Sequence, residues 1–278
     1  MRRYQVKKIL TGSVSGILKV MLCLFFAFPF YWMIITSLKS YMESIRYPPT
    51  LWPKELTLEG YLTVFRGLDV GMYLKNSVII IICIIMMQVV IMVPAAYGFA
   101  RYSFKGSGLL FGIVTIAFMV PSQVTFVSVY IMFSRMRLMR TLLPQILPFG
   151  ANAFGIFLLR QTFKQVPDEL IESARLDDAG EIKIMMEIMI PMAKSTFVTV
   201  ALLSFISHWN AYFWPLVMTT TESVKPFTLC IDKLKDLDYG LVWPTIMAGN
   251  VILVLPVLVL FLFGSKRIIS AMAYRGMK

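Results

Sequence analysis

Residues 157–191 form a charged segment that reads FLLRQTFKQVPDELIESARLDDAGEIKIMMEIMIP. Seven acidic and four basic residues lie here, between two long stretches that carry no charge at all. A short charged helix between two apolar stretches is well placed to contact a partner outside a membrane. This interpretation depends on whether the flanking stretches cross a bilayer.

The composition is that of a membrane protein. Hydrophobic residues make up 58% of the 278 residues, and the mean hydropathy is +0.74. A bilayer core takes about 20 apolar residues as a helix, because backbone polar groups that face lipid must be bonded within their own segment. Six runs without Asp, Glu, Lys or Arg reach this length and predict an all-α integral membrane protein with six transmembrane helices: 20–38, 76–100, 106–134, 141–159, 195–221 and 241–265.

Basic residues indicate the orientation in the membrane. An even number of helices places both termini on one side, and with the termini in the cytoplasm sixteen basic residues lie inside and eleven outside. We therefore expect residues 1–19 and 266–278 to be cytoplasmic and residues 39–75 to form an extracytoplasmic loop. That loop either covers the helix bundle or docks an external partner. The net charge of +12 is spread over both faces, which favours contact with membrane lipid headgroups over nucleic acid.

Several polar side chains lie inside the predicted helices, and the fourth run is the least hydrophobic of the six. Polar residues are tolerated in a membrane where they line a cavity or pack against protein. If a polar solute crosses the bundle, the candidates for its path are Asn152, Trp209, Asn210, Tyr212 and Asn250. Each of them could instead form hydrogen bonds between helices.

The sequence lacks the residues of an enzyme or a metalloprotein. A single histidine, His208, excludes a histidine-based metal cluster, and three isolated cysteines imply no disulfide or metal framework. No Gly-Lys dipeptide occurs, so the chain has no phosphate-binding loop with which to hydrolyse ATP. We expect no metal or cofactor in this chain, and an energy source in a partner.

The charged segment predicts a helix over residues 168–180. Pro167 followed by Asp168 and Glu169 places a rigid turn and acidic groups at the positive end of the helix dipole, and Gly180 is expected to end the helix. At 100° per residue, both faces carry apolar groups: Leu170, Ile171 and Ala174 on one, and Glu172, Leu176 and Ala179 on the other. A helix lying on headgroups would have a basic face, whereas the excess charge here is acidic. Burial in a protein cleft is favoured, with a cationic partner for Glu172.

The segment resembles the EAA motif of ATP-binding-cassette importer permeases. That motif reads Glu-Ala-Ala, three residues, Gly, nine residues, Ile, one residue and Leu-Pro. Here Glu172-Ser173-Ala174 is followed at the same spacing by Asp178, at the glycine position, and by residues 188–191. Ser173 replaces an alanine and Asp178 replaces the glycine, and Gly180 is expected to take over the turn. Other segments resemble maltose-type sugar permeases, namely AAYGFARYSFKG at 95–106, MVPSQV at 119–124 and HWNAYFWPLVM at 208–218.

The resemblance implies a type I importer permease fold in a bacterial cell membrane, with the permease domain over residues 72–265. It places a cytoplasmic coupling helix at about 168–180, between the fourth and fifth transmembrane helices. The implied partners are a second homologous permease, two cytoplasmic ATPase subunits that bind ATP and Mg²⁺, and an extracellular solute-binding protein. The residues expected to couple to the ATPase are Glu172, Ser173, Ala174, Asp177, Asp178, Ala179 and Gly180.

The function that the resemblance implies is ATP-driven import of a sugar, such as an oligosaccharide, or of a related solute such as glycerol phosphate. An ion-coupled secondary carrier is the alternative from another class. Such a carrier would want ionisable residues inside its spans. None of the six runs contains Asp, Glu, Lys or Arg, which weakens that alternative.

Overall fold

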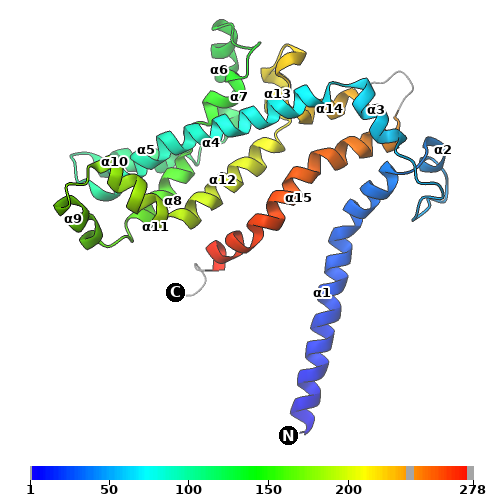
Figure 1. Ribbon diagram of the computed structural model, residues 1–278, viewed down its shortest axis with the longest axis horizontal. Coiled ribbons are helices and arrows are strands. Elements are labelled where there is room, and N and C mark those ends of the chain that lie inside the picture. The colour runs from blue at the N-terminus through cyan, green and yellow to red at the C-terminus, as the bar shows by residue number, and fades with distance from the viewer. Residues whose placement is uncertain (1, 236–240, 274–278) are drawn as a thin grey trace. The chain divides into compact units, whose positions relative to one another are not determined.

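The structure is a computed structural model that describes residues 2–235 and 241–273, with side-chain surroundings for 15–235 and 241–262. Every regular element in these residues is a helix, as Figure 1 shows, so the predicted all-α fold is confirmed. The chain divides into two compact units. Residues 1–69 and 231–255 form the smaller unit, and residues 70–230 and 256–278 form the larger one.

Three helices in the described residues are long and apolar enough to cross a membrane. They are Ser15–Ser37 within α1 (Arg2–Ser37), all of α4 (Val70–Arg101), and Trp243–Leu262 within α15 (Trp243–Ala273). These helices contain most of the first, second and sixth predicted runs. The predicted tail over 266–278 begins inside α15, and residues 274–278 lie outside the described residues.

Two sharply bent pairs of helices are further candidates, each as a broken span or as a re-entrant loop. The first pair joins α5 (Ser107–Ala117) to α6 (Ser122–Arg135) at 92°. The second joins Glu181–Met192 to α12 (Lys194–Trp209) at 80°, where Glu181–Met192 comprises α10 (Glu181–Ile184), the π-helix η2 (Met185–Met189) and α11 (Ile190–Met192). Counting each pair as one span gives five in the part of the chain that is described. The count of six stays a prediction.

The fourth apolar run, 141–159, is a broken segment and does not form one continuous helix. It contains α7 (Leu143–Ile146), the 3₁₀ helix η1 (Leu147–Phe149) and the start of α8 (Ala153–Phe163). A proline, Pro144 or Pro148, stands at the start of each of the first two pieces, where its missing N–H is tolerated. Asn152 then caps α8 by accepting a hydrogen bond from the Gly155 N–H at 2.9 Å.

Gln88 supplies a hydrogen bond at this break. It lies in the middle of α4 with only 2% of its surface exposed. Its Nε2 donates to the Phe149 carbonyl at 2.9 Å, and its Oε1 accepts from the Ser204 hydroxyl at 2.7 Å. Because a buried carbonyl without a donor is costly, one side chain here satisfies the end of η1 and ties α4 to α12.

Helices α4 and α8 pack closely in the larger unit. A Cβ added to Gly155 would lie 2.2 Å from Met92 Sδ, and one added to Gly150 would lie 2.0 Å from Met87 Cε. Absence of a side chain at these two positions lets the backbone of the broken run approach α4. Leu159 is fully buried in an apolar cluster of the larger unit. This apolar cluster also contains Met92 of α4 and Ile171 of the charged segment.

The first turns of α4 hold the segment that joins α13 (Phe213–Met218) to α14 (Phe227–Lys233) through η3 (Glu222–Val224). Tyr73 donates its hydroxyl to Glu222 at 2.5 Å, and the Asn76 amide donates to the Ser223 and Lys225 carbonyls at 2.9 and 3.0 Å. Residues 222–225 are therefore fixed to one end of α4.

Residues 39–69 of the loop predicted at 39–75 are folded within the smaller unit, whereas residues 70–75 form the first turns of α4 in the larger unit. This loop contains α2 (Tyr41–Ser44) and α3 (Glu59–Gly67). The Thr57 hydroxyl accepts from the Glu59 N–H at 3.1 Å, which caps the start of α3. Gly60 is buried against the Pro244 carbonyl, where a Cβ would lie 2.8 Å from the oxygen.

Two charged residues organise the turn between α2 and α3. Lys39 is buried and donates from Nζ to the Thr50 carbonyl at 2.5 Å, and burial lowers its pKa. Glu43 accepts from the Thr50 hydroxyl at 2.6 Å and from the Lys54 N–H at 3.1 Å. The hydrogen bond from Thr50 is the main cause that lowers the pKa of the Glu43 carboxyl.

Replacement of Gln88 tests the role of this side chain at the broken run. Gln88→Leu should lower the free energy of unfolding by about 1–2 kcal/mol, because it leaves the Phe149 carbonyl without its donor. Thermal unfolding of the detergent-solubilised protein measures the change. Gln123→Leu, at an exposed glutamine on α6, is the matched control. A Gln88→Leu protein that unfolds at the same temperature as the control would contradict the assignment.

Candidate functional site

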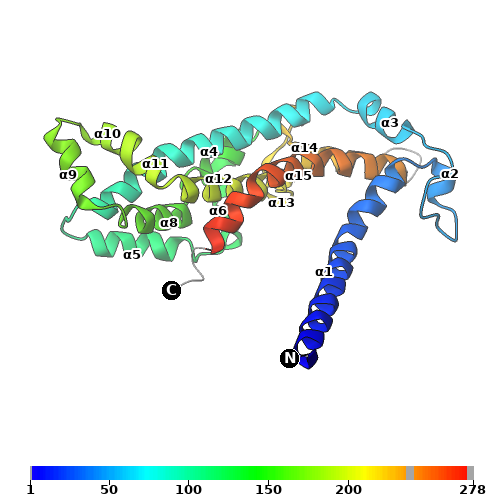
Figure 2. The ribbon, with the colours of Figure 1, turned by 60° about the horizontal axis from the view of Figure 1, so that its bottom comes forward.

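Beyond α8, the charged segment forms α9 (Asp168–Leu176) and the elements that follow it. Helix α9 lies near one end of α4 (Figure 2), where Arg101 contacts Asp168. Pro167 is the N-cap residue with extended backbone, and Asp168 and Glu169 stand in the first turn. The predicted start of this helix is confirmed, because α9 begins at Asp168. The acidic groups lie at the positive end of its dipole.

The two sides of α9 have different surroundings. Ile171 is only 4% exposed, and Ala174 packs against the same apolar cluster of the larger unit. Glu172 is exposed, and Leu176 is 86% exposed. One side is therefore anchored in the protein, and the other presents a carboxylate next to an apolar side chain. Leu170, expected on the anchored side, is also exposed.

The helix ends at Leu176 and is followed by a left-handed residue at Asp178, whereas the sequence predicts an ending at Gly180. Asp178 has φ of +55°, in the left-handed region, whereas Gly180 is extended with φ of −66°. The Ala179 N–H donates to the Ala174 carbonyl at 2.9 Å, and the Asp178 N–H donates to the Arg175 carbonyl at 3.1 Å. These two bonds define a Schellman ending with Asp178 as its left-handed residue.

Asp178 thus takes the backbone conformation that would suit the glycine of the EAA motif. Aspartate is one of the few residues besides glycine that visits the left-handed region. The chain reverses at this residue, so the helical count of 100° per residue does not extend to Ala179. The prediction that places Ala179 opposite Ala174 is wrong, since both pack against the same apolar cluster.

Charged and phenolic groups surround the end of α9. Arg175 donates to Glu181 Oε1 from Nη2 at 2.9 Å and from Nε at 3.2 Å, and this bond is the main cause that raises the pKa of Arg175. The Tyr97 hydroxyl donates to Glu181 Oε2 at 2.5 Å. Burial is the main cause that raises the pKa of the Tyr102 phenol, and its hydrogen bond with Glu181 raises this pKa further.

Arg101 makes a second set of contacts at the start of α9. Its guanidinium donates to Asp168, to the Phe163 carbonyl at 2.6 Å, and to the Val166 carbonyl. The Arg101 side chain is 8% exposed. Sequence reasoning missed Arg101, Tyr97 and Glu181, although Arg101 is the first charge after the second apolar run.

The five candidates for a solute path lie in three places. Asn152 caps α8, and Asn250, in the smaller unit, donates to the Ile246 carbonyl at 2.9 Å. Trp209, Asn210 and Tyr212 lie at the junction of α12 and α13, where Trp209 is buried and stacks on Phe205. The path stays a prediction.

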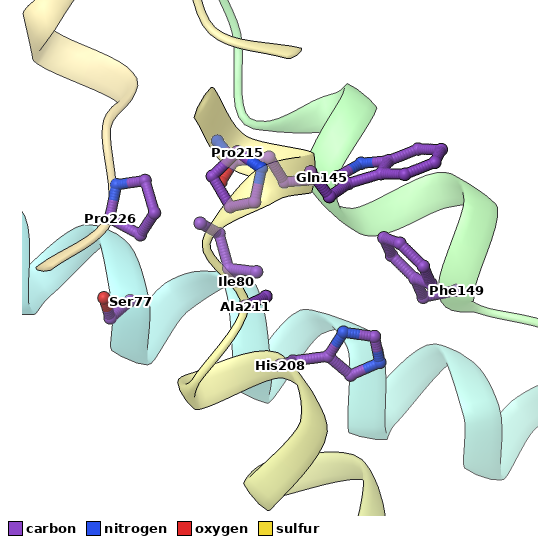
Figure 3. A pocket seen from close by; sticks show the side chains of 9 residues that line it. Ser77, Ile80, Gln145, Phe149, His208, Ala211, Pro215 and Pro226 are labelled. Carbon is purple, nitrogen blue, oxygen red and sulfur yellow. The ribbon is translucent and has the colours of Figure 1, made fainter. Parts of the chain in front are cut away.

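A small cavity lies near this junction, and Figure 3 shows the side chains around it. Its volume is about 20 Å³, and its polar lining includes Ser77, Gln145 and His208. His208 stands against the Phe149 ring, with centroids 4.5 Å apart, and Gln145 donates to the Val224 carbonyl at 2.9 Å. A volume of this size holds about one water molecule, so the cavity is too small for a sugar ring.

Among residues 2–235 and 241–273, no group of three or more His, Cys, Asp or Glu side chains could hold a metal ion. The acidic residues of α9 instead lie along a helix surface or pair with arginine.

Comparison with known proteins decides the family. Residues 92–270 match the family of binding-protein-dependent transport system inner membrane components. The chain belongs to this family. It is therefore a membrane component of a transport system and not an enzyme in itself. Membership supports the predicted importer over the alternative of an ion-coupled secondary carrier.

Relatives match this permease over most of its length. The arabinooligosaccharide transport permease AraQ of Bacillus subtilis is 31% identical over 265 residues, which cover 93% of each chain. The lactose transport permease LacG of Rhizobium radiobacter is 27% identical and covers 88% of this chain and 89% of its own. The sn-glycerol-3-phosphate transport permease UgpE of Brucella abortus is also 27% identical, with coverage of 84% and 85%.

Solved structures share the fold, and one of them shows how far the likeness extends. It is a chain from a bacterial ABC transporter involved in the import of the acidic polysaccharide alginate, and it superposes with a TM-score of 0.84. The match covers 92% of this permease and 96% of that chain, at 21% sequence identity. The predicted importer permease fold is confirmed.

Substitution of Asp178 tests the left-handed ending of α9. Asp178→Ala should speed hydrogen exchange of the last amides of α9 about fivefold, because alanine is disfavoured in this region by roughly 1 kcal/mol. Asp178→Gly should slow the same amides or leave them unchanged. Exchange measured by mass spectrometry on peptides that cover α9 distinguishes the two. Equal exchange in both variants would contradict the assignment.

Proposed function

We propose that this permease takes up a carbohydrate by an ATP-driven mechanism in which α9 is the coupling helix, docked in a cleft of an ATPase subunit. The exposed side of α9 is the observation that carries the proposal. Leu176 at the end of α9 is 86% exposed, and Glu172 on α9 is exposed as well, while Ile182 on the neighbouring α10 is 74% exposed. Apolar side chains next to a carboxylate suit a cleft that offers an apolar floor and a basic residue.

The anchored side of α9 supports the same proposal. Ile171 and Ala174 pack into the core of the larger unit, so a force applied to the exposed side moves the protein and not a loose loop. The Glu172 carboxylate is the group to which we assign the basic partner in the ATPase. Ser173, Asp177, Asp178, Ala179 and Gly180 complete the coupling segment.

The assembly that we propose contains a second homologous permease, two cytoplasmic ATPase subunits and an extracellular solute-binding protein. The ATPase subunits bind ATP and Mg²⁺, and this chain holds no cofactor of its own. The excess of basic residues supports cytoplasmic termini, and α9 lies on the same side. Closure of the ATPases on ATP moves α9 and opens the path toward the binding protein, and hydrolysis resets the two permeases.

The names of the relatives support a sugar as the solute. AraQ and LacG are named for arabinooligosaccharide and lactose transport, and UgpE for glycerol 3-phosphate. The candidates for the path in this permease are amides and aromatic rings, which bind hydroxyl groups and sugar faces and carry no positive charge for a phosphate. We therefore propose a neutral oligosaccharide.

Replacement of Glu172 tests the coupling role. Glu172→Ala should leave the permease in the membrane but reduce the ATPase subunit that copurifies with it by about tenfold, because a charge-assisted contact is lost. Uptake should fall with it. Glu55→Ala, at an exposed glutamate of the loop over 39–75, is the matched control. Full retention of the ATPase with full uptake in Glu172→Ala would refute the coupling role.

Competition tests the class of solute. Proteoliposomes that contain the complete transporter, its binding protein and ATP inside should take up labelled arabinotriose or another neutral oligosaccharide. Excess unlabelled arabinooligosaccharide should compete, and glycerol 3-phosphate should not. Uptake of labelled glycerol 3-phosphate without uptake of any neutral sugar would place the permease with the UgpE type.

A further inference from the structure

We propose that the last turn of α4 is a two-point clamp, made by Tyr97 and Arg101, that transmits movement of α9 to α4. The clamp rests on the proposed coupling role of α9 and adds the residues through which that role acts. Tyr97 and Arg101 are positioning residues, because they touch neither solute nor ATP. Each holds one end of the coupling segment.

Arg101 holds the start of α9. Its buried guanidinium donates to the Asp168 carboxylate and to the carbonyls of Phe163 and Val166. Those carbonyls belong to the end of α8 and to the turn before α9. A guanidinium offers donors in a fixed planar fork, so three acceptors on this stretch of chain keep one geometry relative to α4.

Tyr97 holds the end of α9 through Glu181. The two Glu181 oxygens divide their bonds: Oε2 accepts from the Tyr97 hydroxyl at 2.5 Å, and Oε1 accepts from Arg175 at 2.9 Å. Arg175 stands in the last turn of α9, and Glu181 begins α10. One carboxylate thus joins α4, the end of the coupling helix and the start of the next span.

Helical geometry explains why one turn of α4 serves both ends. Tyr97 and Arg101 are four residues apart, so their side chains lie on the same face of α4, about one turn from each other. Two contacts at separate points restrain rotation as well as translation of α9. A single contact would leave the helix free to pivot.

The opposite end of α4 is bonded to a second segment of the same unit, which movement of α4 would reach. A helix of 32 residues is about 48 Å long, and its first turns hold residues 222–225 through Tyr73 and Asn76. Both ends lie in the same compact unit. A displacement that enters at α9 therefore reaches the segment between α13 and α14 along one helix.

A charge reversal at the Arg175–Glu181 pair tests the clamp without removing a buried side chain. The Arg175 and Glu181 side chains are both about half exposed, so Arg175→Glu and Glu181→Arg should fold. In the complete transporter, each single variant should lower binding-protein-stimulated ATP hydrolysis about tenfold, the scale of coupling between neighbouring charged residues. The double variant should recover to within about threefold of the unmodified protein, because the pair forms again in reverse while the Tyr97 hydroxyl has lost its carboxylate acceptor.

Tyr97→Phe removes one hydroxyl and should lower the same stimulation by about threefold while the KM for ATP is unchanged. Copurification of the ATPase should stay complete in all these variants, because docking through Glu172 is intact. Lys105→Met, at an exposed lysine beyond the end of α4, is the control and should leave stimulation unchanged.

Two results would overturn the clamp. One is full stimulation in the single charge reversals and in Tyr97→Phe, and the other is a double variant no better than its parents. Release of the ATPase by Arg175→Glu would also overturn it, because Arg175 would then belong to the docking surface. Glu172→Ala tests the coupling role itself, so failure of the clamp is distinguishable from failure of the proposed function.

Discussion

A buried guanidinium at the end of a membrane helix organises the functional end of this permease. Arg101 is the first charged residue after a long apolar run, and burial obliges it to find acceptors. It finds them in Asp168 and in carbonyls at the end of α8 and the turn that follows. The chain between α8 and α9 is thereby fixed to α4, and the exposed side of α9 has a defined direction.

The same requirement for hydrogen-bond partners accounts for the rest of the larger unit. The broken run between α7 and α8 exposes backbone groups that a continuous helix would satisfy, and Gln88 provides a donor to the Phe149 carbonyl. Gly150 and Gly155 let this irregular backbone lie against α4. Pro94 removes one backbone hydrogen bond within α4.

Much of this architecture could be predicted from the sequence. Apolar runs without charge predict membrane helices, and the spacing from Glu172 to residues 188–191 indicates the coupling motif. The end of α9 could not be predicted, because residue type favours Gly180 for a turn, whereas the bonds at Ala174 and Arg175 place the left-handed residue at Asp178. The contacts of Tyr97 and Arg101 join residues more than sixty positions apart, and no local pattern encodes such pairs.

The central claim is that the end of α4 and α9 move as one body when the ATPases close. Spin labels at Lys105 and Glu169, both exposed, measure this directly by pulsed electron resonance in the assembled transporter. The distance between them should have the same mean without nucleotide and with ATP trapped, while the distance between labels at Glu169 on α9 and the ATPase of the opposite side changes. A shift between Lys105 and Glu169 as large as the shift of the ATPase would contradict the account.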